Sequence, residues 1–264
     1  MTSKKEIIVI KLGGALLAAP EPLVPFWDGL KQLQQEASVV IVHGGGPQAT
    51  AMARRLGHEP RIVRGRRVTG DLDLQIMQWT VRGELNTNLV ARAAAHGIQA
   101  VGLSGVDGGT VRVTKRPPWQ IDGESVDFGH VGDIDRIETD LLERLLSAGF
   151  MPVLSPLGVD TQGRVYNVNA DTIACAVAAA LRASQFLLVT ESGGVRRDKD
   201  RPDSRLDVCS VATFEQGARE GWIEGGMRVK LEVALDAVRA GIPEVFILAP
   251  DDVLERQSGT RVTR

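Results

Sequence analysis

Short runs of aliphatic and β-branched residues alternate with longer segments of helical periodicity along almost the whole chain. Few of these runs carry polar residues at alternate positions, so the strands they predict are buried on both faces. This order predicts an α/β protein in which a mainly parallel sheet lies between helices. The predicted strands span 7–12, 39–42, 100–103, 152–155, 186–190 and 245–248.

The segments between the strands have the spacing of apolar residues that is typical of amphipathic helices. Two interruptions, 111–131 and 159–165, contain turn residues and β-prone pairs, and they predict antiparallel hairpins appended to the main sheet. We expect one domain with a soft boundary between an N-lobe of about 1–160 and a C-lobe of about 161–264. The predicted helices span 47–56, 71–82, 86–96, 140–148, 171–181 and 227–240.

Composition limits the possible partners. The chain has 264 residues, 43% of them hydrophobic, which is enough for one large core. A net charge of -2 offers no overall attraction to nucleic acid or to an anionic membrane, so we expect neither as a partner. Cys175 and Cys209 lack the spacing of a metal site or a disulfide framework, which favours a cytoplasmic location. The apolar N-terminal run is interrupted by Lys11 and is too short for a signal sequence or a membrane span.

Glycine-rich turns follow the first two predicted strands. Lys11-Leu12-Gly13-Gly14 places a cation and a close backbone approach at the carboxyl edge of the sheet, although a tight turn with a solvated lysine has the same pattern. His43-Gly44-Gly45-Gly46-Pro47 precedes a helix, and together they predict an anion-binding nest. Residues 44–49 also fit a loose dinucleotide fingerprint, which leaves a dehydrogenase as an alternative. That fingerprint follows the second strand, however, and no later strand ends in an acidic residue at the expected distance.

Two further clusters carry more polar groups than local structure requires. In Arg66-Arg67-Val68-Thr69 a guanidinium could hold a carboxylate through two hydrogen bonds, although such a run is commonly a solvated basic loop. Asn167, Asn169 and Asp171 lead into a helix. A helix N-terminus needs one capping side chain, so the excess predicts contacts to a ligand or to a lysine.

Gly225-Gly226 opens another helix, with Lys230 expected in its first turn. A cation there opposes the helix dipole by about 0.3–1 kcal/mol, whereas a phosphate bound at the same end would reverse the sign, which favours a functional lysine. The sequence has no Walker A loop, zinc cluster or Gly-x-Ser-x-Gly elbow. We interpret His43 and His130, both beside glycine, as structural groups rather than bases.

In this order the motifs resemble those of acetylglutamate kinases, within the amino-acid kinase family. The resemblance runs through nearly the whole chain, and further segments such as Gly102-Leu103-Ser104-Gly105 and Gly129-His130-Val131-Gly132 take part in it. It implies a three-layer αβα sandwich in which the N-lobe holds the acyl amino acid and the C-lobe holds MgATP. It also implies transfer of the ATP γ-phosphoryl group to the side-chain carboxylate of N-acetyl-L-glutamate, in arginine biosynthesis.

By this resemblance Lys11 and Lys230 brace the transferring phosphoryl group and Asp171 orients both lysines. ATP and Mg²⁺ are the expected ligands, with no metal-binding cluster supplied by the protein. The expected substrate-binding residues are Gly44, Gly45, Arg67, Asn167 and Asn169, and the expected phosphate-binding residues are Gly13, Gly14, Gly225 and Gly226.

The segment after the fifth predicted strand departs from the family pattern. Thr190, Glu191 and Gly194 belong to the expected nucleotide-side loop, but glutamate follows the threonine where the family usually has aspartate. Residues 196–205 are charged, and we expect a mobile loop over the nucleotide. A sensor that has lost catalysis is therefore a possible alternative. A kinase for acetylated or carrier-linked α-aminoadipate is another, because one methylene changes specificity by only ~1–3 kcal/mol.

The resemblance also leads to an expectation about assembly. Arginine-inhibited members of the family have an additional N-terminal helix that links dimers into a hexamer. Only residues 1–5 precede the first strand, which we expect to start near Glu6, and they amount to about one helical turn. We therefore expect a homodimer, joined through the helix at 71–82 and the adjoining sheet edge, that is insensitive to arginine.

Overall fold

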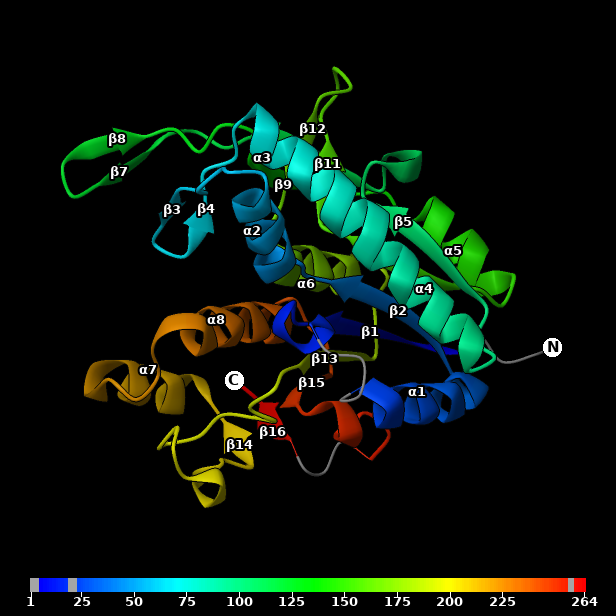
Figure 1. Cartoon of the computed structure of the whole chain (residues 1–264). Helices are drawn as coiled ribbons and strands as arrows, with labels where there is room; N and C mark the ends of the chain where they lie inside the picture. The colour runs from blue at the N-terminus through cyan, green and yellow to red at the C-terminus, as the bar shows by residue number, and fades with distance from the viewer. Residues whose placement is uncertain (1–4, 19–22, 256–258) are drawn as a thin grey trace.

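An eight-stranded sheet lies at the centre of the computed structural model, which describes residues 5–18, 23–255 and 259–264 (Figure 1). The strand order is β14-β16-β15-β13-β1-β2-β10-β5, and every neighbouring pair is parallel except β15 and β16. All six predicted strands are present, and the mainly parallel sheet is confirmed. The strands are β1 (Glu6–Leu12), β2 (Ala37–His43), β5 (Ala100–Ser104), β10 (Met151–Ser155), β13 (Gln185–Val189), β14 (Val208–Cys209), β15 (Glu244–Leu248) and β16 (Thr260–Val262).

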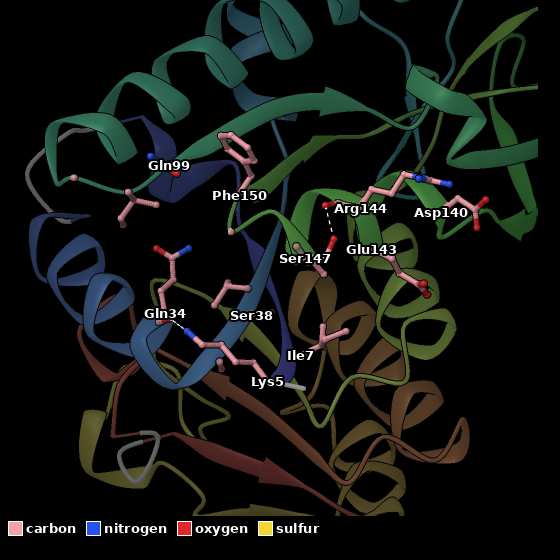
Figure 2. Close-up of a pocket in the computed structure, with 16 residues that line it drawn as sticks. Lys5, Ile7, Gln34, Ser38, Gln99, Asp140, Glu143, Arg144, Ser147 and Phe150 are labelled. Carbon is pink, nitrogen blue, oxygen red and sulfur yellow. Dashed lines mark hydrogen bonds between the residues drawn. The ribbon is translucent and has the colours of Figure 1, made fainter. Parts of the chain in front are cut away.

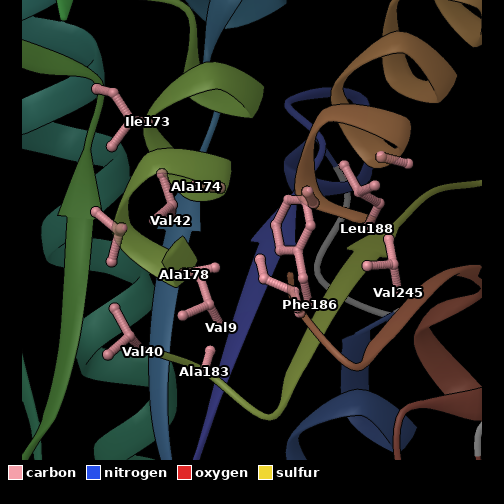
Figure 3. Packing of buried hydrophobic residues seen from close by; sticks show 14 of the residues in the cluster. Val9, Val40, Val42, Ile173, Ala174, Ala178, Ala183, Phe186, Leu188 and Val245 are labelled. Atoms are coloured by element: carbon pink, nitrogen blue, oxygen red, sulfur yellow. The ribbon is translucent and has the colours of Figure 1, made fainter. Parts of the chain in front are cut away.

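Helices cover both faces of this sheet, which explains its unbroken apolar strands. Val9 packs with residues of α6 and α8 on one face of the sheet (Figure 3). Its neighbours Ile8 and Ile10 pack with residues of α1 and α4 on the other face. The three-layer αβα sandwich is thereby confirmed. Besides α3, the α-helices are α1 (Val24–Glu36), α2 (Gly46–Arg55), α4 (Asn86–Ala95), α5 (Asp140–Ser147), α6 (Ala170–Ala180), α7 (Val211–Glu220) and α8 (Gly225–Arg239).

One helical run replaces two predicted helices. The segments predicted at 71–82 and 86–96 join as α3 (Asp71–Ile76), a π-helix η3 (Met77–Leu85) and α4. The backbone stays helical at both junctions, at Met77 and Asn86, and no proline interrupts the run. The prediction of two separate helices was therefore wrong, because nothing in this segment removes a backbone donor or caps an end.

The two predicted hairpin regions do not extend the main sheet. Strands from both regions join one separate four-stranded sheet, in the order β12-β11-β6-β9, and β7 and β8 form a two-stranded sheet. β11 pairs with β12 around the predicted turn, β7 pairs with β8, and β6 pairs with the later strand β9. A third small sheet joins β3 and β4. The strands are β3 (Ile62–Val63), β4 (Arg66–Arg67), β6 (Val111–Lys115), β7 (Trp119–Ile121), β8 (Glu124–Val126), β9 (Gly132–Ile137), β11 (Leu157–Val159) and β12 (Val165–Asn167), with short 3-10 turns η1 (Ala15–Leu17), η4 (Asp107–Gly109), η5 (Pro202–Ser204) and η6 (Pro250–Asp252).

The register brings the predicted turns to one edge of the main sheet. Leu12 of β1 lies opposite His43 of β2 and Val189 of β13, so the chain leaves all three strands side by side. The expected assembly depends on the N-terminal segment, and residues 1–4 of that segment lie outside the part of the chain that the structure describes. Among the helices that the structure describes, none is long and apolar enough to cross a membrane.

Candidate active site

The two glycine turns pack against each other at the carboxyl edge of the sheet. Gly44 N donates to the Leu12 carbonyl at 2.9 Å, and Gly13 N donates to the Val189 carbonyl at 3.4 Å. A Cβ atom on Gly14 would lie 3.0 Å from the Gly45 nitrogen. The absence of side chains therefore lets the two turns approach closely.

A cavity of about 380 Å³ opens beside these turns and gathers eight of the predicted residues. It extends from the end of β1 to the β3–β4 hairpin and the start of α6. The predicted residues that line it are Lys11, Gly14, Gly44, Gly45, Arg67, Asn167, Asn169 and Asp171.

A buried ion pair lies at one end of the cavity. Lys11 Nζ is 2.8 Å from Asp171 Oδ1, and the two side chains are 7% and 13% exposed. Asn169 caps α6, since its Oδ1 accepts a hydrogen bond from the Thr172 amide at 2.9 Å. Asp171 is therefore not used as the cap and remains available to hold Lys11. Asn167 Nδ2 donates to Thr69 Oγ1 at 3.1 Å.

Lys230 approaches this pair from α8. Because α8 begins at Gly225, Lys230 lies in the second turn and not in the first, which corrects the sequence-based placement. Its Nζ reaches back to the Gly226 carbonyl at 3.3 Å. Burial lowers the pKa of Lys230, the Asp171 carboxylate opposes this shift, and the Lys11 charge adds to it. The two predicted lysines thus lie close enough to interact, although they come from opposite ends of the chain.

Arg67 is held beneath the second glycine turn. One terminal nitrogen donates to Thr50 Oγ1 at 2.6 Å and to the Gly46 carbonyl at 3.2 Å, and the other lies 3.6 Å from Asp73 Oδ1. Burial lowers the pKa of Arg67, and Asp73 opposes that shift. These contacts fix the guanidinium at the wall of the cavity.

Sequence reasoning missed two further arginines that line the cavity. Arg116 is 8% exposed and donates from Nε and a terminal nitrogen to Asp133 Oδ1 at 2.8 and 2.6 Å. Its guanidinium lies 4.9 Å from the Trp119 ring centroid, and that of Arg66 lies 5.2 Å from the same centroid. No local motif marks Arg116, whereas Arg66 lies in the Arg66–Thr69 motif, from which the resemblance selects only Arg67 as a ligand-binding residue. Their presence makes the cavity strongly cationic.

The predicted nucleotide-side loop follows β13 at the same sheet edge but does not line this cavity. Thr190 N donates to the Leu248 carbonyl at 2.9 Å, and Glu191 is exposed. Gly194 has a φ of 146°, and a Cβ atom there would lie 2.8 Å from Thr260 Oγ1, so a side chain would be strained. The segment predicted as a mobile loop is closed by a hydrogen bond from Arg197 N to the Ser204 carbonyl at 3.1 Å.

A larger cavity of about 1030 Å³ lies at the opposite edge of the sheet, where the strands begin (Figure 2). It contains none of the predicted site residues. Glu143 and Arg144 of α5 bring opposite charges to it, and Phe150 lies at its wall. Because the lining carries charges of both signs, it favours neither an anionic nor a cationic ligand. No group of three or more His, Cys, Asp or Glu able to hold a metal ion occurs among the described residues.

Known proteins resemble this chain in both sequence and fold. Residues 6–249 match the model of the amino acid kinase family. The chain belongs to this family. Curated acetylglutamate kinases are similar over nearly their whole length: that of Methanopyrus kandleri is 43% identical, covering 94% of this chain and 96% of the relative, and that of Bacteroides thetaiotaomicron is 36% identical, covering 99% and 100%.

Solved structures share the amino acid kinase fold. The smu.665 protein of Streptococcus mutans superposes with a TM-score of 0.81 at 27% identity, over 97% of this chain and 98% of that one. An N-acetylglutamate synthase from Neisseria gonorrhoeae superposes with a TM-score of 0.82 at 24% identity, over 99% of this chain and 60% of that one. The second likeness concerns the fold alone.

Proposed function

We propose that this chain is an N-acetyl-L-glutamate 5-kinase that uses MgATP. The main support for the proposal is the Lys11–Asp171 ion pair at one end of a cationic cavity, with Lys230 within electrostatic range of both residues. Full-length similarity to curated acetylglutamate kinases supports the choice of acceptor. The product would be an acyl phosphate on the way to arginine.

The chemistry needs positioning and charge neutralisation rather than a base. An oxygen of the substrate's side-chain carboxylate, already ionised, attacks the γ-phosphorus, and the bond from that phosphorus to the β–γ bridging oxygen breaks as ADP leaves. Lys11 and Lys230 place positive charge where negative charge is spread in the transition state. Asp171 keeps Lys11 in place at 2.8 Å. Mg²⁺ enters with ATP as part of the substrate, held mainly by phosphate oxygens and water.

The other end of the cavity suits the acyl amino acid. Arg67 is fixed within it and is proposed to hold the α-carboxylate through paired hydrogen bonds. Asn167 and the Gly45 amide supply neutral hydrogen-bonding groups for the acyl amide. In this arrangement the lobe of about 1–160 holds the acceptor and the lobe of about 161–264 holds the nucleotide.

A coupled assay of ADP release tests the proposal. The expected result is ATP-dependent turnover with N-acetyl-L-glutamate, and much weaker turnover with free glutamate and with N-acetyl-α-aminoadipate at equal concentrations. Turnover with the aminoadipate compound but not with N-acetylglutamate would overturn the choice of acceptor. Binding of both substrates by calorimetry without any product would instead indicate a sensor.

We also infer that the protein functions as a homodimer. The helical run α3–η3–α4 exposes Trp79 and Leu72, which are 56% and 39% accessible, and β5 forms one edge of the main sheet. A two-fold pairing would cover these features, and it is the commonest closed assembly of soluble enzymes.

A further inference from the structure

A buried polar chain lies behind the second glycine turn. His43 and Asn86 are both 0% exposed. Asn86 Nδ2 lies 2.9 Å from His43 Nε2 and 2.9 Å from the Val153 carbonyl, while its Oδ1 accepts from Arg82 at 3.2 Å. At the other side of the ring, His43 Nδ1 lies 2.8 Å from the Gly44 carbonyl.

These contacts assign the proton on the histidine ring. The Val153 carbonyl can only accept, so the Asn86 group facing it must be the amide NH₂. The same NH₂ faces His43 Nε2, which therefore accepts, and the single ring proton lies on Nδ1 and is donated to the Gly44 carbonyl. Burial lowers the pKa of His43 to about 4, so the ring is neutral at physiological pH.

The direction of the Gly44 carbonyl decides the direction of the next amide. In a trans peptide the carbonyl of one residue and the N–H of the next point in opposite directions, and the described chain has no cis peptide. With the Gly44 carbonyl held against His43, the Gly45 N–H points away from that ring. The Gly45 nitrogen lies beside Gly14, 3.0 Å from where a Cβ atom on Gly14 would be, and both glycines line the cavity. The Gly45 N–H has no hydrogen-bond partner among the described residues.

We propose that Asn86 is a positioning residue that, through the Nδ1–H tautomer of His43, aims the Gly45 amide at the bound substrate. This inference deepens the proposed function and rests on it. The π-helix that ends beside Asn86 adds a second support, since Val81 would lie 2.7 Å from any Cβ atom on Gly45. Val81 therefore packs closely against the second glycine turn, and the hydrogen bond from His43 to the Gly44 carbonyl orients it.

The first test reads the tautomer directly. The chain has four histidines, so ¹⁵N spectra of the labelled protein at neutral pH are tractable. The expected result for wild-type His43 is a neutral ring protonated at Nδ1. A ring protonated at Nε2, or on both nitrogens, would overturn the proposal. In Asn86→Leu we expect Nε2 to lose its donor and the Nδ1–H signature to weaken.

The second test separates positioning from folding. Asn86→Leu is expected to lower kcat/KM by about 10–100-fold in the folded protein, with Thr80→Val as the matched control. Thr80 is buried on the π-helix η3, which directly precedes Asn86, and its hydroxyl has no hydrogen-bond partner in the described structure, so its variant should stay within about twofold of wild type.

If Asn86→Leu fails to fold, Asn86→Gln replaces it as the test variant. Asn86→Gln keeps the side-chain amide, so it should retain part of the wild-type kcat/KM. Equal kcat/KM for Asn86→Leu and Thr80→Val at equal folded fractions would overturn the proposal. If the wild type does not phosphorylate acetylglutamate, the proposed function fails, whereas the spectrum still decides the tautomer.

Discussion

Lys230 is an ammonium whose burial lowers its pKa and whose removal leaves no buried partner unpaired. Lys230→Ala is therefore expected to lower kcat about 100-fold or more while leaving the melting temperature unchanged or slightly higher. Steady-state kinetics with calorimetric melting measures both. Arg228→Ala is the control, because Arg228 is exposed on the same helix and its side chain forms an ion pair with Glu232 at 3.1 Å. A Lys230→Ala enzyme with near-normal kcat would contradict the proposed mechanism.

Arg67 is predicted to act on substrate binding more than on the chemical step. Removing a charged hydrogen-bond donor typically costs ~1.5–3 kcal/mol, so Arg67→Ala should raise KM for acetylglutamate about 10–100-fold, with a smaller effect on kcat and on KM for ATP. The variant also leaves Asp73 buried without this partner, so Arg67→Lys is needed as a second measurement. Exposed Arg61 offers a control in the same basic segment. An unchanged KM in Arg67→Lys and Arg67→Ala would refute the assignment.

His43 predicts a pH dependence of stability. Its pKa is about 6.5 in the unfolded chain and about 4 in the fold, mainly because burial disfavours the charged ring. Between these values the unfolded state binds a proton that the folded state does not, so stability present at neutral pH is lost as the pH falls. From pH 6.5 to 5 this histidine contributes a loss of about 2 kcal/mol. Urea unfolding at pH values across this range measures the loss of stability. An NMR titration that gave His43 a pKa near 6.5 in the folded protein would show that this histidine is not the cause.

At the scale of elements, the contact between the second glycine turn and the π-helix can be tested with two adjacent glycines. A Cβ atom on Gly45 would lie 2.7 Å from Val81, whereas one on Gly46 would meet nothing within 4 Å. Gly45→Ala is therefore expected to destabilise the protein by about 1–3 kcal/mol, and Gly46→Ala to leave stability equal or up to ~1 kcal/mol higher. Chemical denaturation of both variants checks this. If both alanine substitutions destabilised the protein equally, the requirement for glycine would come from the start of α2 and not from the contact with Val81.

At the scale of the whole molecule, the proposed dimer makes Trp79 a partner contact. Light scattering over a concentration series should give twice the 28.4 kDa chain mass for the wild type, and about one chain mass for Trp79→Glu. Leu56→Glu is the control, because Leu56 is similarly exposed at 52% but lies at the end of α2. A monomeric wild type, or a Trp79→Glu variant that stays dimeric, would exclude this surface as the interface.

The sequence by itself determined the elements and their class. Buried parallel strands need apolar residues on both faces, so β1, β2, β10 and β13 are visible as unbroken aliphatic runs, and this is a local property. The glycine turns and the polar start of α6 are equally local, since each places several unusual residues within a few positions. Together with the family resemblance, the motifs identified eight of the residues that line the cavity, among them Lys11, Arg67 and Asp171.

Only the tertiary structure decided which groups meet and which state they adopt. Lys230 comes within electrostatic range of Lys11 because α8 packs beside α6. Arg116 is held at the cavity because β6, which it follows, pairs with β9 and brings it to Asp133. The role of Asn86 depends on a contact with His43 across 43 residues, buried between the helical run and the sheet. Such contacts depend on which groups are buried together and on the direction of each backbone N–H. Neither can be predicted from a local pattern of residues.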